Sequence, residues 1–203
     1  EMRQFITGFE IDLSGKVSCV NCPAYSAQRA DDATWCQCFE GYSLDGTSTG
    51  EIYTQTIDCQ PIKYNAIYSC GDGSGTAPVA DQVMYGTEYT VAENTECVRN
   101  GYTFTGWEID INDIKYTAGE VITWNWKADV TFTATWQKNA YTITFDKMGG
   151  TGGTDSVTVM YNELPPVIEV PTKAGYDFVG YYDAESIEQA TKFYEGNGTP
   201  IFK

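Results

Sequence analysis

Histidine is missing from all 203 residues of the chain. Imidazole is the side chain that titrates near neutral pH, so its absence excludes the Ser-His-Asp, Cys-His and His-Glu-x-x-His arrangements of hydrolases. A two-carboxylate glycosidase site would need only Asp and Glu, but nothing in the sequence places two of them across a cleft. We therefore expect no enzymatic activity, no cofactor and no metal site.

Positive charge is also scarce. The chain has 12 Lys and Arg against 28 Asp and Glu, which gives a formal net charge of −16. Such a surface repels phosphate groups, and no basic cluster offsets it, so we expect neither nucleic acid nor an anionic membrane surface as a partner. No apolar run approaches the roughly 20 residues that a membrane-spanning helix needs, and no signal peptide is visible.

Cysteines crowd the first third of the chain, at positions 19, 22, 36, 38 and 59. Few apolar residues surround them, and segments this small are normally held by cross-links in oxidising surroundings. Because the chain also starts at Glu1, we interpret it as a processed or excised piece of an exported protein. A zinc site at Cys19, Cys22, Cys36 and Cys38 is the competing interpretation, although it would leave Cys59 without a role.

The rest of the chain contains a tandem repeat. Gly101-Tyr-Thr-Phe-Thr-Gly-Trp107 returns as Gly175-Tyr-Asp-Phe-Val-Gly-Tyr181. Aromatic residues alternate with small or polar ones between two glycines, which predicts a strand with one buried aromatic face and a bulge or close approach at the inner glycine. The expected core aromatics are Tyr102, Phe104, Trp107, Tyr176, Phe178 and Tyr181.

Further strands are expected around this pair. Residues 63–68 and 139–145 open the two copies, and each runs into a glycine-rich stretch that favours a wide turn over a phosphate-binding loop. Residues 79–85 and 156–161 form second strands that end in Met-Tyr. Residues 130–136 alternate apolar residues with threonine and close the first copy, whereas the second copy has no counterpart.

Two stretches resemble known families. Cys36-Gln-Cys-Phe-Glu-Gly-Tyr42 resembles the C-terminal half of an epidermal-growth-factor-like module, which implies that Cys38 pairs with Cys59 and Cys36 with Cys22 or Cys19. From residue 62 onward, Gly-Tyr-Thr-Phe-Thr-Gly-Trp, Tyr-Thr-Ala-Gly, Val-Thr-Phe-Thr-Ala-Thr-Trp, Tyr-Thr-Ile-Thr-Phe-Asp and the Gly-Gly-Thr-Gly-Gly turn resemble the internalin-type B-repeat, also called the Listeria-Bacteroides repeat. That resemblance implies small β-grasp-like modules, strung in tandem on secreted or surface-attached bacterial proteins, without catalytic residues.

The first copy departs from the second at two positions. Cys70 and Cys97 stand where the second copy has Lys147 and Pro171. A pair of cysteines in one copy of an exported repeat indicates an added disulfide, and free thiols are the alternative.

The sequence thus predicts a mainly β chain of four segments: an N-terminal strand (1–16, with 5–13 extended), a cysteine-rich EGF-like module (17–61), a first B-repeat (62–138) and a second B-repeat that lacks its closing strand (139–203). An uncovered sheet edge is a template for another strand. We expect either that the polypeptide continues past Lys203 or that another subunit fills the gap, with 5–13 as the candidate donor.

The function expected is that of an extracellular, structural or adhesive cell-surface protein, a stalk or filament component whose partners are neighbouring repeats or subunits. The alternative is a module that binds a glycan or a host or matrix ligand. Trp124 and Trp126, on one side of a short polar segment, would then form an exposed platform for sugar rings.

Overall fold

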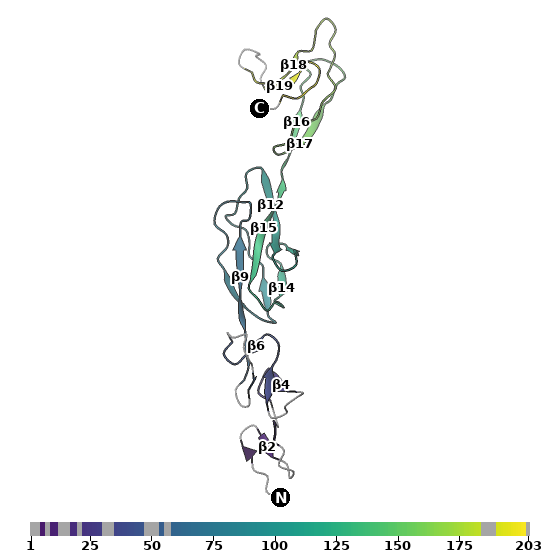
Figure 1. Cartoon of the computed structure of the whole chain (residues 1–203). Coiled ribbons are helices and arrows are strands. Elements are labelled where there is room, and N and C mark those ends of the chain that lie inside the picture. The colour runs from purple at the N-terminus through teal and green to yellow at the C-terminus, as the bar shows by residue number, and fades with distance from the viewer. Residues whose placement is uncertain are drawn as a thin grey trace. The chain divides into compact units, whose positions relative to one another are not determined.

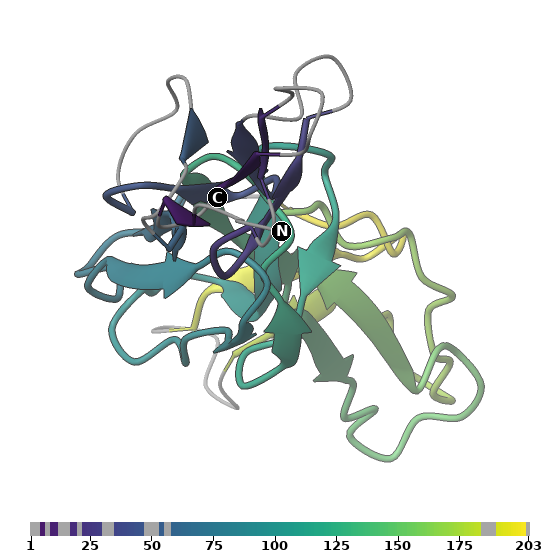
Figure 2. The same ribbon diagram turned by 90° about the horizontal axis from the view of Figure 1, so that it is seen from below.

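The computed structural model describes residues 22–29, 35–46, 58–183 and 190–201 with their side chains. It also describes the backbone of short strands at Phe5–Ile6, Phe9–Ile11, Val17–Cys19 and Tyr53–Thr54. Every regular element in this part of the chain is a β-strand, as Figures 1 and 2 show. The expectation of a mainly β fold is confirmed.

Contacts divide the chain into two compact units. The first comprises Glu1–Cys97 and Thr105–Thr135, and the second comprises Val98–Phe104 and Trp136–Lys203. Val98–Phe104 therefore belongs to the first repeat by sequence but to the second unit by packing.

The N-terminal segment forms a small antiparallel sheet in the order β1-β2-β3 instead of one long strand. These strands are Phe5–Ile6, Phe9–Ile11 and Val17–Cys19. Ile6 lies opposite Phe9, so the chain reverses within residues 5–13. The predicted continuous strand was wrong, and the strand expected to act as a donor is not formed. Gly8 follows Ile6 closely in the sequence, and glycine weakens an extended strand because it has no side chain to pack.

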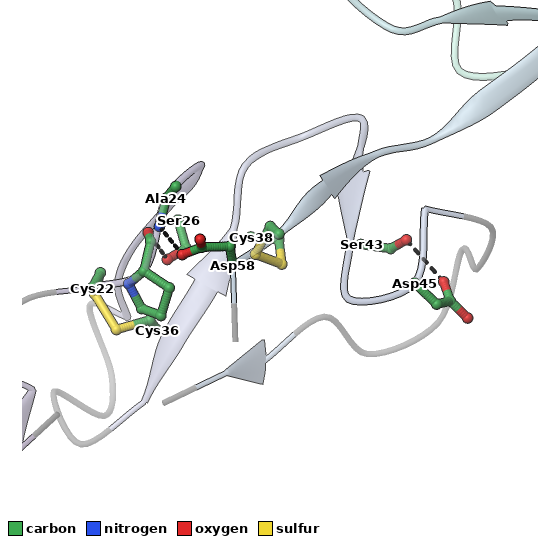
Figure 3. Close-up of a disulfide and its surroundings, with 10 residues drawn as sticks. Cys22, Ala24, Ser26, Cys36, Cys38, Ser43, Asp45 and Asp58 are labelled. Carbon is green, nitrogen blue, oxygen red and sulfur yellow. Dashed lines mark hydrogen bonds between the residues drawn. A yellow bond between two sulfur atoms is a disulfide. The ribbon is translucent and has the colours of Figure 1, made fainter. Parts of the chain in front are cut away.

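The cysteine-rich segment consists of two small antiparallel sheets. The first has the order β4 (Ser26–Gln28), β5 (Cys36–Cys38), β7 (Tyr53–Thr54), and the second joins β6 (Tyr42–Ser43) to β8 (Gln60–Pro61). Disulfides join Cys22 to Cys36, seen in Figure 3, and Cys38 to Cys59. The side chain of Cys19 lies outside the described residues.

These disulfides contradict the zinc alternative, because a metal binds thiolates and these sulfur atoms are oxidised. Cys36, Cys38 and Cys59 are buried, so much of the small core of this segment is sulfur. Short polar links fix the loops around it: the Ala24 N–H donates to Asp58 Oδ1 at 2.8 Å (Figure 3).

The first repeat is built on a five-stranded sheet in the order β10-β9-β15-β12-β13. Its strands are β9 (Lys63–Ser69), β10 (Asp81–Met84), β12 (Tyr102–Ile109), β13 (Lys115–Tyr116) and β15 (Val130–Lys138). β11 (Glu88–Thr90) and β14 (Val121–Thr123) form a separate antiparallel pair. β15 is the closing strand predicted at 130–136, and it lies in the middle of the sheet, parallel to β9 from Val130 opposite Ala66 (Figure 1).

The core of this repeat is aromatic. Val130, Phe132 and Ala134 alternate inward along β15, as the sequence predicts. The ring of Phe132 stacks on Tyr68 with centroids 5.0 Å apart, and Tyr68 meets Trp107 edge-on at 4.8 Å.

One polar pair lies inside this core. The hydroxyl groups of Tyr68 and Tyr89 are 2.9 Å apart, and the Ala92 N–H donates to the Tyr68 oxygen at 2.8 Å. Burial is the main cause that raises the pKa of both phenols above the ordinary value, and the hydrogen bond to Tyr68 raises that of Tyr89 further.

The close backbone approach predicted at the inner glycine of the aromatic strand occurs in both copies. Gly106 has φ 139° and Gly180 has φ 140°, and a Cβ at either would lie within 2.6 Å of a carbonyl oxygen, that of Tyr116 or of Tyr194 respectively. Only glycine tolerates this backbone and this approach. Burial does not alternate regularly across Gly106: Trp107 is fully buried although it follows Phe104 by an odd number of residues.

The second repeat has two small antiparallel sheets, β16 (Ala140–Thr144) with β17 (Ser156–Met160) and β18 (Gly180–Tyr182) with β19 (Lys192–Glu195). Phe145, Ile168 and Tyr194 form its buried core, against which Tyr181 packs. The strand predicted from 175 was wrong for residues 175–179, and Tyr176 is 72% exposed. In the first copy β15 pairs with the equivalent strand β12, whereas no described strand of the second copy pairs with residues 175–179.

We predict that the Tyr68 and Tyr89 pair makes the first unit sensitive to alkali. Because the folded pKa of each is raised, the neutral pair stabilises the fold fully below about pH 10 and this stabilisation is lost as the pH rises toward the folded values. Urea midpoints measured at pH 8 and pH 10.5 should fall less steeply for Tyr68→Phe/Tyr89→Phe than for the parent. The exposed-residue control Tyr176→Phe should keep the parental slope, and equal slopes for all three proteins would refute the prediction.

Candidate functional site

The described part of the chain offers no constellation for chemistry. No group of three or more Cys, Asp or Glu side chains in it is arranged to hold a metal ion. Its open hollow beside Lys147, Met148 and Tyr176 contains no cluster of acids or nucleophiles. The Asp110 carboxylate accepts a hydrogen bond from the Thr131 N–H at 3.0 Å, so it caps the start of β15.

The predicted platform of two indoles is not exposed. Trp124 is fully buried, and Trp126 is half-buried and meets it edge-on with centroids 5.1 Å apart. Trp124, which directly follows β14, also packs on Tyr89, whereas Asn125 is exposed. The hypothesis of an exposed sugar-binding platform at Trp124 and Trp126 was therefore wrong.

The predicted core aromatics differ in burial. Trp107 is fully buried, and Tyr102, Phe104, Phe178 and Tyr181 are half-buried. Phe104 packs edge-on against Trp136 at 5.8 Å, and Phe178 against Tyr181 at 5.0 Å. Tyr176 is the one among them that the structure leaves exposed.

The two copies stabilise the same corner by different means. In the first repeat Cys70 and Cys97 form a disulfide, the pair that the sequence analysis selected. In the second repeat Lys147 forms an ion pair with Asp155 and donates to the Gly153 carbonyl at 3.3 Å, while Pro171 is buried beside them. A covalent link in one copy thus stands where the other has an ion pair and a packed proline.

A single type of turn occurs at three places in the chain. The N–H of Tyr42, Tyr102 and Tyr176 donates to the carbonyl oxygen three residues earlier, at 3.0, 3.0 and 3.1 Å. The residue before each tyrosine is a glycine with positive φ: Gly41 at 82°, Gly101 at 76° and Gly175 at 79°. A turn with a positive φ at its third residue requires glycine there, and the missing Cβ leaves a flat spot beside the tyrosine ring.

In the first unit a tyrosine from the following segment occupies this flat spot. A Cβ at Gly41 would lie 2.2 Å from ring carbon Cδ1 of Tyr85, and the rings of Tyr42 and Tyr85 meet edge-on at 6.5 Å. The backbone completes the contact, because the Ile62 N–H donates to the Gly41 carbonyl at 2.9 Å and the Tyr85 N–H donates to the Ile62 carbonyl at 3.1 Å. We call this arrangement a tyrosine joint.

The second unit contains an equivalent tyrosine joint. A Cβ at Gly101 would lie 2.2 Å from the ring of Tyr161, which meets Tyr102 edge-on at 5.9 Å. The Asn139 N–H donates to the Gly101 carbonyl at 2.9 Å, and the Tyr161 N–H donates to the Asn139 carbonyl at 2.8 Å. The guanidinium of Arg99 lies 4.0 Å above the centre of the Tyr102 ring, a cation–π contact.

Sequence reasoning missed Tyr85 and Tyr161 as functional residues. They end the two predicted Met-Tyr strands, which was the signal available, but their receiving glycines lie 44 and 60 positions earlier in the chain. The joint at Gly101 also explains why Val98–Phe104 packs with the second unit.

Comparison of the sequence with known proteins supports the two repeats that the sequence analysis identified. The family model of the Listeria-Bacteroides repeat domain matches residues 64–135 and 141–199, more than half of the chain. A protein named as a Gly-rich membrane protein in Evansella cellulosilytica is 31% identical over 134 residues, and Internalin H of Listeria monocytogenes is 36% identical over 135 residues. These alignments cover 64% and 63% of the chain but only 15% and 22% of the relatives. No solved structure matches the chain.

We predict that Cys70→Ser/Cys97→Ser destabilises the first unit by about 3 kcal/mol, since the disulfide closes a loop with a sequence separation of 27. Urea unfolding of the variant and the parent measures this loss. Peptide mapping without reductant should find the cross-link, and alkylation of both thiols in the unreduced parent would contradict it.

We further predict that Gly101→Ala destabilises the second unit by about 2 kcal/mol more than Gly175→Ala. Both glycines have almost the same φ, so both substitutions carry the same backbone strain, but only the methyl group at 101 collides with a tyrosine ring. Thermal unfolding of the two variants measures the difference. Equal losses would show that Tyr161 does not rest on Gly101.

Proposed function

Because the chain belongs to the Listeria-Bacteroides repeat domain family, we propose that it is a structural segment of an extracellular bacterial surface protein. The observation that carries the proposal is the tyrosine joint, which occurs twice with the same backbone hydrogen bonds and the same ring contact. Each joint attaches a repeat to the segment that precedes it. Its role is mechanical continuity, and it involves no catalytic group.

The cross-links support an extracellular location. Disulfides Cys22–Cys36, Cys38–Cys59 and Cys70–Cys97 persist in oxidising surroundings and are rare in the cytosol. Neither the acidic charge nor the burial of Trp124 favours a ligand-binding role over a structural one. Within the described residues no helix is long and apolar enough to cross a membrane. The partners proposed are neighbouring repeats and subunits of a surface assembly.

The family and the relatives support the same proposal at a coarser level. One relative is named as a membrane protein, and the chain spans less than a quarter of the length of either relative. A segment of this kind serves a larger protein by holding other parts at a distance from the cell.

We predict that a protease added to intact cells that produce the full protein releases peptides from residues 62–203. Mass spectrometry of the supernatant measures them, and peptides of an abundant cytosolic protein serve as the lysis control. Release of the repeat peptides only after lysis would refute an extracellular location. Unchanged adhesion of the cells after deletion of the repeats would further separate a structural role from an adhesive one.

A further inference from the structure

The third of the three turns is open. Gly175 has the same positive φ as Gly41 and Gly101, but a Cβ built on it would meet nothing within 4 Å. Tyr176 is 72% exposed. Among the described residues no N–H donates to the Gly175 carbonyl, whereas the carbonyls of Gly41 and Gly101 each accept one.

The turn is nevertheless preformed. The Tyr176 N–H donates to the Lys173 carbonyl at 3.1 Å, and the Lys173 ammonium lies 4.9 Å from the centre of the Tyr176 ring, the position that Arg99 takes above Tyr102. The same lysine donates to the Met148 carbonyl at 2.8 Å, which anchors the turn to the rest of the repeat. The turn therefore holds three features in place: Gly175 without a Cβ, the ring of Tyr176 and the Gly175 carbonyl that can accept a hydrogen bond.

The two occupied turns show what fits this surface. In both joints the occupant is the tyrosine that directly follows the second strand of the following repeat, Tyr85 after β10 or Tyr161 after β17. In both, the Gly carbonyl accepts from the first residue of that repeat. In the first repeat β15 leads directly to Asn139, the residue that makes this bond. Among the described strands of the second repeat, β16 pairs only with β17 and β18 only with β19, whereas in the first repeat β15 lies between their counterparts β9 and β12.

Resting on the proposed function, we infer that the Gly175–Tyr176 surface is the docking site for the corresponding tyrosine of a further repeat of the same type. That repeat is reached through a strand placed between β16 and β18. Its tyrosine ring lies on Gly175 and meets Tyr176 edge-on, and the N–H of its first residue donates to the Gly175 carbonyl. The chain is thus built to receive a third repeat on the same pattern.

The test extends the full chain. A copy of residues 125–203 is joined to Lys203, so that it supplies a closing strand and a further repeat, and the Tyr176 of the copy is replaced by Phe to make its peptide distinguishable by mass. Hydroxyl-radical footprinting then compares the original Tyr176 in the 203-residue chain and in the extended chain. The modification rate should fall severalfold in the extended chain, to the level of Tyr102 in the same molecule.

A matched control carries the copy's Tyr161→Ala, which removes only the docking ring and should restore the high rate of the original Tyr176. Gly175→Ala provides a second readout: it should lower the unfolding midpoint more in the extended chain than in the parent, because only there does the methyl group meet a ring. An unchanged Tyr176 rate in an extended chain whose Tyr194 peptide, identical in the two copies, is protected would overturn the inference. Protection in the 203-residue chain that grows with concentration would also overturn it, by placing a second copy there. Neither result affects the release of repeat peptides by protease from intact cells. The docking inference and the proposed surface location can therefore be refuted independently.

Discussion

The architecture of the first repeat depends on one strand having two hydrogen-bonded neighbours. β15 lies between β9 and β12, and it contributes Val130, Phe132 and Ala134 to the buried core. Beside this partner β12 runs for eight residues, and Trp107, directly after the positive-φ Gly106, is fully buried. The second repeat has a glycine with nearly the same positive φ, Gly180, but its counterpart of β12 has only three residues in strand conformation. The alternating aromatic pattern alone is therefore not enough to form a long strand when no neighbouring strand pairs with it.

Local patterns predicted the local features well. The period of residues 130–136 identified β15, the repeated inner glycine identified both close backbone approaches, and the cysteines unique to the first copy identified a cross-link. Each of these depends on residues that are close in sequence or equivalent between copies. Errors arose where pairing decides the outcome: Phe5–Ile6 pairs antiparallel with Phe9–Ile11, and 175–179 form no strand.

The candidate site escaped prediction for a related reason. Two tryptophans separated by one residue indicate a common face, but whether that face is inside depends on what packs against it. Trp124, directly after β14, contacts Tyr89 and Phe132. The tyrosine joints require a turn and a strand end that are far apart in the chain to meet. Neither Gly101 nor Tyr161 carries a local signal for the other, so only their spatial contact shows the relation.

The parallel pairing of β9 with β15 decides how the first repeat responds to tension. The chain enters the sheet at Lys63, at the start of β9, and Val130 to Thr133 of β15 run beside Ala66 to Ser69 in the same direction. A pull on Lys63 and on Thr135 therefore drags two parallel neighbours in opposite directions along their length. Their interstrand hydrogen bonds are loaded together in shear and do not open one after another from an end, so the sheet gives way only when several break at once.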